Sequence, residues 1–493
     1  MPNNSLPLPL ISSMSERDAD TTGGPTDEDS YIVNGYVDKI KGDKVNIIKR
    51  PGVIADDTYS SASEGRGLYY WEDNIYTCVD GAIYKNGASI HATVDTTSGR
   101  VYWDQSLEDS GVLIMQDSAN LYKIASNDTV TEISPTYTLP ATMVPGIVVL
   151  NQFVLVADAD GNIYNSEVGN IDSNFTDSIN AEILSDKLKT IRRFHNYCVA
   201  FGEKSIQLFY VPTTPSATGS PLEPLAGTFS YVGCASGNSV ANVGDNLYWV
   251  GRDQQGLISV YTMKGLTPEK VSSSAVDRLL AKTQGSFDAN RMEGYGFRLG
   301  GHDMYVLSYY DGSTDDDGYT IVYDKDVDMW YYWNNASQET FNTSGFVQSN
   351  SDSTAHFAYS LERYNAGAST DIRSYYVSTN NGQDFSADFP FTIVAPEFDS
   401  SNDMQKFASR LMIDGDTIPD SFTTNTVSIS WKDDDEASYS TARTTKMTKG
   451  NKFLTRLGTF RSRRFKFDYT GDAPFQIGKA YLTFMQGSHG VGV

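Results

Sequence analysis

Histidine and cysteine are scarce in this chain, which has 493 residues but only five His and three Cys. No spacing such as His-x-x-x-His joins any two histidines, so metal catalysis has little support in the sequence. Cys78, Cys198 and Cys234 form an odd set without a close pair, which excludes a disulfide framework and a zinc spacing. We expect three buried free thiols in a protein that folds in a reducing compartment.

Basic residues are also few. The chain holds 38 Lys and Arg against 62 Asp and Glu, so its net charge is −24. This excess of negative charge argues against a main surface that grips nucleic acid, because phosphates would be repelled. There is no apolar run long enough to span a bilayer, and the opening MPNNSLPLPLISSMSERDAD has no basic leader. We therefore predict neither a membrane-spanning segment nor a signal peptide.

Motifs of common enzymes are missing. The sequence contains no Gly-x-Ser-x-Gly elbow, no Gly-x-x-x-x-Gly-Lys phosphate loop and no Gly-x-Gly-x-x-Gly between a strand and a helix. Only STDDDGYTIVYD (313–324) approaches a Ca²⁺-binding loop, through Ser313, Asp315, Asp317, Gly318 and Asp324. Its flanks read as strands, so an acidic hairpin loop is favoured. We predict no catalytic residue, no cofactor and no metal.

Short strands and tight turns are what the chain has in abundance. It contains 31 Tyr, 23 Phe and 41 Gly, a composition that suits half-buried sheets joined by hairpins. Hairpin-like units recur about every 35 to 55 residues, within the range of propeller blades. They cover residues 67–87, 111–125, 146–166, 191–211, 239–265, 295–333 and 345–378. This recurrence predicts an all-β protein built on a β-propeller, with seven blades favoured, although six also fit the spacing.

Near residue 390 the recurring hairpin units give way to separate alternating segments, which indicates a second module. Alternating segments beyond that point predict a C-terminal β-sandwich-like domain. We therefore divide the chain into an extended N-terminal arm (1–30), a β-propeller (31–390) and the sandwich-like domain (391–493). One helix is expected in TPEKVSSSAVDRLLAKTQ, where Val276, Leu279 and Leu280 share an apolar face that would pack outside a blade.

The second module carries a basic segment within an acidic chain. Residues 441–470 hold nine Lys and Arg and one acid, a local charge of +8 against −32 for the remainder. In RFKFDY, strand alternation places the aromatic residues on one face and Arg464, Lys466 and Asp468 on the other. Either a solvated strand face or an interface with an acidic neighbour explains this pattern. The candidate interface residues are Arg443, Lys446, Lys449, Arg456, Arg461, Arg463, Arg464 and Lys466.

One segment leaves an enzymatic alternative open. SWKDDDEASYS (430–440) is similar to a degenerate Asp box, a structural hairpin of sialidase-like propellers, with Glu436 in place of Gly and Tyr439 in place of Trp. A retaining glycosidase would also need two carboxylates about 5 Å apart, and no pair stands out among the acids of the chain. A glycan-binding or glycan-cleaving propeller is the alternative function.

Several segments match one family in their order along the chain. They are SLPLPLI, YIVNGYV followed by KRPGV, VAFGEKSIQLFYV, the long run 221–277, GHDMYVLSYYDG followed by TIVYDKDVDMWYYW, and VSISWKDDDEASYS followed by RLGTFRSRRFKF and AYLTF. Together they resemble the packaged-DNA stabilisation proteins, also described as tail hub or nozzle proteins, of short-tailed bacteriophages. The resemblance covers most of the chain from about residue 31 to residue 486.

This resemblance implies a structural virion protein and not an enzyme. Six copies would form a homo-oligomeric ring below the portal adaptor and extend the DNA channel to the tail tip, in contact with tail fibres or spikes and with a tail needle or plug. Packaged DNA would be retained and would pass at ejection without sequence-specific binding. An acidic protein fits such a passage, because it offers no cations to bind phosphates. The implied location is the virion tail, assembled in the host cytoplasm.

Overall fold

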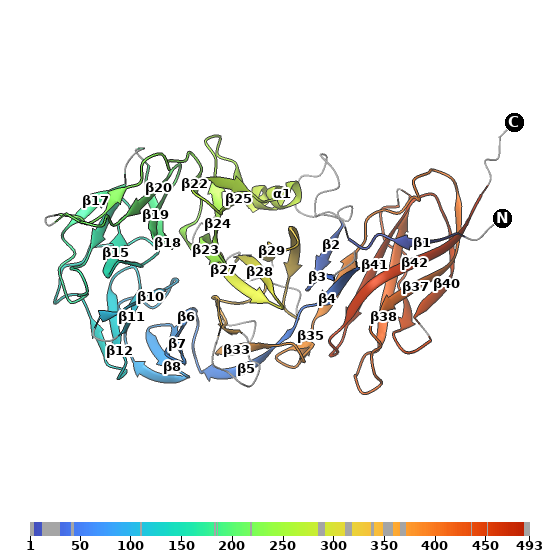
Figure 1. Cartoon of the computed structure of the whole chain (residues 1–493). Helices are drawn as coiled ribbons and strands as arrows, with labels where there is room; N and C mark the ends of the chain where they lie inside the picture. Colours follow the sequence, from blue (N-terminus) through green and yellow to red (C-terminus); the bar gives the residue numbers. More distant parts are fainter. Residues whose placement is uncertain are drawn as a thin grey trace.

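The protein consists of a ring of small sheets and, beside it, two packed sheets that contain the first and last described strands (Figure 1). The structure is a computed structural model. It describes residues 4–11, 30–40, 44–108, 111–181, 184, 186–216, 219–283, 291–310, 318–336, 340–348, 358–364, 371–434, 436–450 and 452–487.

Seven units of four antiparallel strands make up the ring. Blade 1 contains β6 (Gly65–Trp71), β7 (Asn74–Val79), β8 (Ala82–Lys85) and β9 (Ala88–His91). Blade 2 contains β10 (Tyr102–Ser106), β11 (Val112–Gln116), β12 (Leu121–Ala125) and β13 (Val130–Glu132). Blade 3 contains β14 (Val148–Leu150), β15 (Phe153–Ala157), β16 (Asn162–Asn165) and β17 (Ser178–Asn180). Blade 4 contains β18 (Leu188–Phe194), β19 (Tyr197–Gly202), β20 (Ile206–Tyr210) and β21 (Glu223–Pro224).

The remaining three blades are less regular. In blade 5 the first strand is split into β22 (Gly233–Cys234) and β23 (Ala241–Val243) around the 3-10 helix η2 (Gly237–Ser239), followed by β24 (Asn246–Arg252), β25 (Ile258–Met263) and β26 (Pro268–Lys270). Blade 6 contains β27 (Met292–Leu299), β28 (His302–Tyr309), β29 (Tyr319–Asp324) and β30 (Met329–Trp333). Blade 7 contains β31 (Phe346–Val347), β32 (Tyr359–Leu361), β33 (Ile372–Ser378) and, from near the N-terminus, β5 (Gly52–Tyr59).

The first strands of the blades contact one another in a closed series. β6 touches β10, β10 touches β14, β14 touches β18, and β18 touches η2. β23 touches β27, β27 touches β31, and β31 touches β6 again. The blades therefore surround one axis, which confirms the predicted β-propeller and its favoured count of seven blades among the described residues.

Turn residues with left-handed backbone conformations explain why the strands fold back so tightly. Asn86 and Gly87 join β8 to β9 with φ values of 46° and 77°, which Asn and Gly adopt at lower cost than other residues. The Asn-Gly signal in the sequence is therefore a true hairpin turn.

Two sheets pack face to face in the sandwich. The first has the order β3 (Gly35–Ile40), β4 (Lys44–Lys49), β42 (Gln476–Gln486), β37 (Lys406–Gly415) and β40 (Phe453–Phe460), and β1 (Asn4–Leu8) also pairs with β42. The second has the order β2 (Tyr31–Val33), β36 (Pro390–Val394), β41 (Arg463–Thr470), β38 (Thr426–Asp433) and β39 (Arg443–Lys446). Inward side chains such as Leu411 and Leu482 from the first sheet and Phe467 from the second share one core.

The sandwich draws on both ends of the chain, and this differs from the predicted division at residues 1–30, 31–390 and 391–493. β1 lies within the predicted arm, and β2, β3 and β4 lie within the predicted propeller. β1, β2 and β4 pair with strands several hundred residues away, as Leu6 does with Leu482, and β3 joins the sheet through its neighbour β4. Local sequence pattern does not report such pairings, because it shows where a strand is but not which sheet it joins.

β2 makes the propeller and the sandwich continuous. It pairs in parallel with β30 through Val33 and Tyr332, and antiparallel with β36, so blade 6 and the second sandwich sheet form one nine-stranded sheet. The core on this sheet runs from Trp333 in blade 6 to Phe467 in the sandwich. The two parts are therefore joined by backbone pairing and by a common core.

Two smaller expectations are confirmed. α1 (Ser274–Thr283) packs against β25 of blade 5 and buries Val276, Leu279 and Leu280. The free cysteines at positions 78, 198 and 234 are all buried.

Candidate functional site

The chain crosses from the sandwich to the propeller at Arg50, a buried residue between β4 and β5. Its guanidinium pairs with both carboxylate oxygens of Asp384, in the hairpin of β34 (Gln383–Asp384) and β35 (Ala387–Asp388). It also donates to the backbone carbonyl of Asn334, just after β30, at 2.9 Å, and to the side-chain oxygen of Asn34 at 3.0 Å. One side chain thus contacts three separate segments.

Asn34 completes this Arg50 cluster, which comprises Asn34, Arg50, Asn334 and Asp384. Asn34 lies between β2 and β3 with φ 54°, a conformation that Asn tolerates better than most residues. Its amide donates to the carbonyl of Pro390, where β36 begins, and its oxygen accepts the backbone N–H of Asn334 at 2.9 Å. The cluster therefore holds blade 6, the β34–β35 hairpin and the sandwich together.

Lys49 is buried beside the Arg50 cluster. Its Nζ donates to the carbonyls of Gly382 and Gly471 at 2.7 and 2.6 Å and lies 4.1 Å from the centre of the Phe389 ring. Burial, followed by the charge of Arg50, lowers the pKa of Lys49 to about 7. The side chains of Lys49 and Arg50 are both buried in contacts within the chain, so neither is available to bind a partner.

His302 forms a second polar contact between the propeller and the sandwich. On β28, its Nδ1 lies 2.9 Å from the buried carboxylate of Asp324, and its Nε2 lies 3.8 Å from Asp38 on β3. The hydrogen bond to Asp324 raises the pKa of His302, while burial acts in the opposite direction. Potential ligand atoms of His302, Asp324 and Asp326 lie within 4.8 Å of one another, but the close His302–Asp324 pair already accounts for the geometry.

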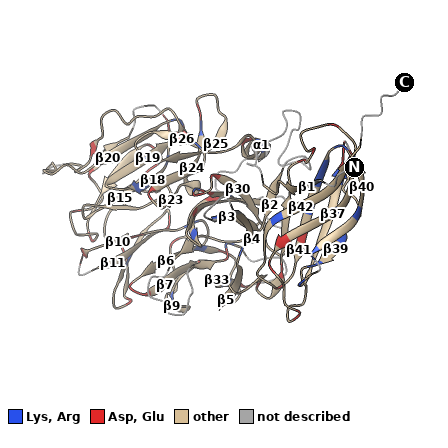
Figure 2. Cartoon of the chain, turned by 45° about the vertical axis from the view of Figure 1, so that its right-hand side comes forward, with Lys and Arg blue, Asp and Glu red and all other residues tan. Residues whose placement is uncertain are grey.

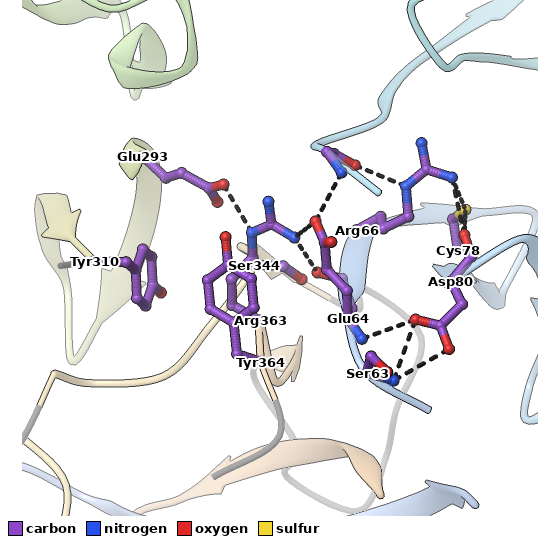
Figure 3. Close-up of polar contacts among 12 residues, drawn as sticks. Ser63, Glu64, Arg66, Cys78, Asp80, Glu293, Tyr310, Ser344, Arg363 and Tyr364 are labelled. Carbon is purple, nitrogen blue, oxygen red and sulfur yellow. Dashed lines mark hydrogen bonds and ion pairs between the residues drawn. The ribbon is translucent and has the colours of Figure 1, made fainter. Parts of the chain in front are cut away.

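A buried charge cluster closes the ring between blades 6, 7 and 1 (Figure 3). Arg363, after β32, donates from Nε to Glu293 of β27 at 2.7 Å and pairs through Nη1 with Glu64, just before β6. Glu293 is fully buried, and Glu64 also accepts the backbone N–H of Gly99 at 2.8 Å. Burial lowers the pKa of Arg363, but Glu293 and other neighbours raise it above the ordinary value overall, so the guanidinium stays charged.

Arg66 extends this Arg363 cluster, defined as Glu64, Glu293 and Arg363, towards blade 2 (Figure 3). The Arg66 guanidinium donates to the carbonyls of Gly99, Asp80 and Thr96 at 2.7, 2.9 and 2.6 Å. The Thr96 hydroxyl donates in turn to Asp117, in the turn between β11 and β12, at 2.9 Å. The carboxylates of the cluster are bound to cations or backbone donors, an arrangement that suits ring closure.

Side chains from opposite blades meet on the propeller axis. Arg100, just before blade 2, donates to the carbonyls of Asn238 and Gly294, in blades 5 and 6, at 2.7 and 2.9 Å. The Tyr102 hydroxyl donates to the Asn238 side chain, and the Arg192 guanidinium of blade 4 lies 4.3 Å from the centre of the Tyr102 ring. The axis is therefore filled at this level by protein side chains.

The structure places part of the predicted basic interface on the surface. Lys446, Lys449, Arg456 and Arg461 are exposed on or beside β39 and β40. Arg443 is half-buried because its guanidinium donates to the carbonyls of residues 455 and 456, which ties the edge of one sandwich sheet to the other. Figure 2 shows Lys and Arg on several strands of the sandwich.

Arg463 differs from the predicted interface role. It is 1% exposed, and its guanidinium pairs with Asp433 of β38 and donates to the carbonyl of Leu457 at 2.7 Å. On β41 it shares the inward face with Phe465, because residues two apart point to the same side of a strand. Reversing this charge would disrupt the sandwich itself, so Arg463 cannot report on assembly.

Arg464 and Lys466 lie on the opposite face of β41, as strand alternation predicts. Arg464 is 9% exposed, and Lys466 is half-buried with its Nζ 3.3 Å from Asp468. Asp468 also accepts the hydroxyl hydrogen of Thr392 on β36 at 2.6 Å. Arg464 and Lys466 are therefore less exposed than side chains on a solvated strand face would be.

The Asp-box-like segment (430–440) and the described part of the Ca²⁺-like segment (313–324) both make structural contacts within the chain. The Asp-box-like segment lies in the β38–β39 hairpin of the sandwich, where Asp433 binds Arg463. Residues 313–317 of the Ca²⁺-like segment lie outside the described residues, and Asp324 pairs with His302.

The clusters around Arg50 and Arg363 were not predicted from the sequence. KRPGV and YIVNGYV are predicted as strand segments and as matches to a family, and the only local hint of the cluster is an Arg directly before Pro and Gly at a strand boundary. The partners of Arg363 lie 299 and 70 residues away in the chain, so no local pattern connects them.

Comparison with protein-family models identifies a family for most of the propeller. A family model described as "Bacteriophage P22 Gp10, beta-propeller" matches residues 31–311. No curated protein shows a significant match to the chain. The crystal structure of Raptor from Chaetomium thermophilum matches with 14% identity and a TM-score of 0.36, over 67% of this chain and 29% of that chain, values too low to support a functional comparison. In the described part of the chain, no helix is long and apolar enough to cross a membrane.

Replacing Arg363 with Met should strongly destabilise the propeller, because Glu293 would be left buried without its cation. We expect Arg363→Met to lower the free energy of unfolding by about 3–5 kcal/mol, measured by urea denaturation. The matched control is Lys85→Met, which removes the partly exposed pair of Lys85 with Asp128 and should cost about 1 kcal/mol or less. Equal losses in the two variants would show that the Arg363 cluster does not stabilise ring closure.

His302 should make stability depend on pH. A histidine whose folded pKa is raised stabilises the protein at pH values below its unfolded pKa, and this contribution disappears as pH rises through the folded pKa. His302→Gln should therefore lose about 1–3 kcal/mol relative to the parent at pH 5.5 and much less at pH 9. The exposed His195, with φ 53°, provides the control variant His195→Asn. A loss in His302→Gln that is the same at both pH values would rule out the charged pair with Asp324.

Proposed function

The chain belongs to the bacteriophage P22 Gp10 β-propeller family, whose members stabilise packaged DNA, and from this we propose that it forms the hub or nozzle of a short phage tail. Membership establishes a structural component of the phage virion. The match over residues 31–311 carries the proposal, because it includes the crossing at Arg50 and blades 1 to 5.

In the proposed arrangement several copies form a closed ring below the portal adaptor. Six copies, as the family resemblance implies, would surround the DNA channel, with tail fibres or spikes and a needle or plug attached. The subunit would act by assembly and would have no catalytic role. Rings of identical subunits are a common outcome when complementary surfaces lie on different parts of one chain.

The filled propeller axis supports a channel formed between copies. Arg100 bridges from blade 2 to the backbone of blades 5 and 6, which leaves the axis occupied by side chains. A strand of DNA could not pass along this axis without displacing them. A passage for the genome would therefore lie along the outside of each subunit, in the centre of the ring.

The charge of the chain supports passage without tight binding. With a net charge of −24, the protein offers few cations to replace the counterions of DNA, so binding energy from phosphate contacts is small. We place the four exposed cations Lys446, Lys449, Arg456 and Arg461 at a contact with an acidic protein surface, where opposite charges guide docking.

The experiment that tests this function is quantitative mass spectrometry of purified virions, with the portal protein as the internal standard. We expect about six copies per particle, the stoichiometry of a closed cyclic ring. Virions from a phage with a nonsense mutation in this chain serve as the control and should lose packaged DNA. Absence of the chain from particles, together with hydrolysis of host polysaccharide by the free protein, would overturn the proposal in favour of the glycan alternative.

A further inference from the structure

Lys49 is a buried lysine that has no carboxylate partner among the described residues. It is the last residue of β4 and is 3% exposed. No carboxylate oxygen of the described residues lies within 4.0 Å of its Nζ. Lysines are rarely buried without a partner, because a charge removed from water is costly. An uncharged amine at this position would avoid that cost.

The titratable groups that face Lys49 come from several segments. They are Arg50, Asp384, Asp388, Tyr469 and Asp472. Each carboxylate among them is bound elsewhere. Asp384 pairs with Arg50, Asp388 accepts a side-chain hydrogen bond within the β34–β35 hairpin at 2.8 Å, and Asp472 accepts a backbone N–H from the segment before β38 at 3.0 Å. Lys49 thus lies next to the cation Arg50 without an anion of its own.

The acceptors around the Lys49 amine match its uncharged form. Nζ donates to the carbonyls of Gly382 and Gly471 at 2.7 and 2.6 Å. An ammonium carries three N–H groups and an uncharged amine carries two, so these carbonyls satisfy only the uncharged form. The rings of Phe389 and Tyr469, at 4.1 and 5.3 Å from Nζ to the ring centres, lie beside the amine. Their faces attract a cation, but by less than the loss of its hydration costs.

Lys406 shows the arrangement that an ammonium requires. It is fully buried at the start of β37, and its Nζ donates to the carbonyls of Asn402, Met404 and Arg461 at 2.8, 2.9 and 2.7 Å. Every N–H of the charged form therefore has an acceptor. Burial lowers the pKa of Lys406 as well, but only Lys49 lacks a third acceptor among the described residues.

The two acceptors of Lys49 lie at the joint between the propeller and the sandwich. Gly382 lies between β33 of blade 7 and β34, and Gly471 directly follows β41 of the sandwich. A Cβ on Gly382 would lie 2.5 Å from the carbonyl oxygen of Asp472, so the two loops are in contact. Protonation of Lys49 would therefore place an unsatisfied charge where the two parts of the molecule meet, next to Arg50.

We propose that Lys49 is uncharged in the folded protein above neutral pH, where its two carbonyl acceptors satisfy it, and that its proton uptake weakens the joint between the propeller and the sandwich as the pH falls. This property is independent of the proposed function. Burial, followed by the charge of Arg50, lowers the pKa of Lys49 from 10.5 to about 7. Between these values the unfolded chain binds more protons than the folded one, so stability rises with pH over that range and is lowest below pH 7.

The test compares urea unfolding of the full chain and of Lys49→Gln at pH 6.5 and pH 9. Gln keeps two N–H donors for the two carbonyls but takes up no proton. We expect the folding equilibrium constant of the parent, divided by that of Lys49→Gln, to rise at least about tenfold from pH 6.5 to pH 9. His302 titrates in both proteins, so its contribution cancels. The matched control is Lys406→Gln, for which the same ratio should change little.

A ratio that stays constant for Lys49→Gln, or a rise of the same size for Lys406→Gln, would overturn the proposal. If Lys49→Gln does not fold, NMR of the parent with ¹³C at the lysine Cε atoms decides the question. We expect one lysine resonance to titrate with a midpoint near pH 7, as an amine without a third acceptor should. A parent in which every lysine resonance titrates above pH 9 would show that Lys49 stays charged.

Discussion

The buried guanidinium of Arg50 fixes the propeller and the sandwich to each other. Arg50 is buried where the chain passes from β4 of the sandwich to β5 of the propeller. Its N–H groups donate to Asn34, Asn334 and Asp384. A buried guanidinium is costly unless its donors are satisfied, so the fold is stable only with these partners in place around Arg50. The propeller and the sandwich are consequently built around the same side chain.

Closure of the propeller follows from this crossing. β5 begins two residues after Arg50 and completes blade 7, so the strand that shuts the ring is positioned from the sandwich. Within the ring, Arg363 of blade 7 joins blades 6 and 1 through its ion pairs with Glu293 and Glu64. Because β2 also extends blade 6 into the sandwich, neither part has an independent boundary. A subunit of this kind presents its two ends at a fixed separation, which suits repetitive assembly.

Local sequence pattern was sufficient to predict the blades, but it was insufficient to predict which distant strands pair between the propeller and the sandwich. Each of the seven hairpin units became a blade, because turn residues such as Asn86 and Gly87 and alternating apolar residues act within a few positions. The placement of β2 to β4 in the sandwich depends on pairings across hundreds of residues. The need for glycine at position 52 of KRPGV is also visible only in the folded structure, because a Cβ there would lie 2.1 Å from the carbonyl oxygen of Gln383. Strand alternation with Phe465 accounts for the inward side chain of Arg463, but its pairing with Asp433 is set by the register of β41 against β38.

Differential scanning calorimetry of the intact chain and of Arg50→Leu tests whether the propeller and the sandwich unfold as one unit. If the Arg50 cluster and the shared sheet make one cooperative unit, the parent unfolds in a single transition whose calorimetric and van't Hoff enthalpies agree. Arg50→Leu should then unfold at lower temperature and separate into two transitions, one for each part. Two well-separated transitions in the parent, unchanged by Arg50→Leu, would instead show that the propeller and the sandwich fold independently and that Arg50 does not couple them.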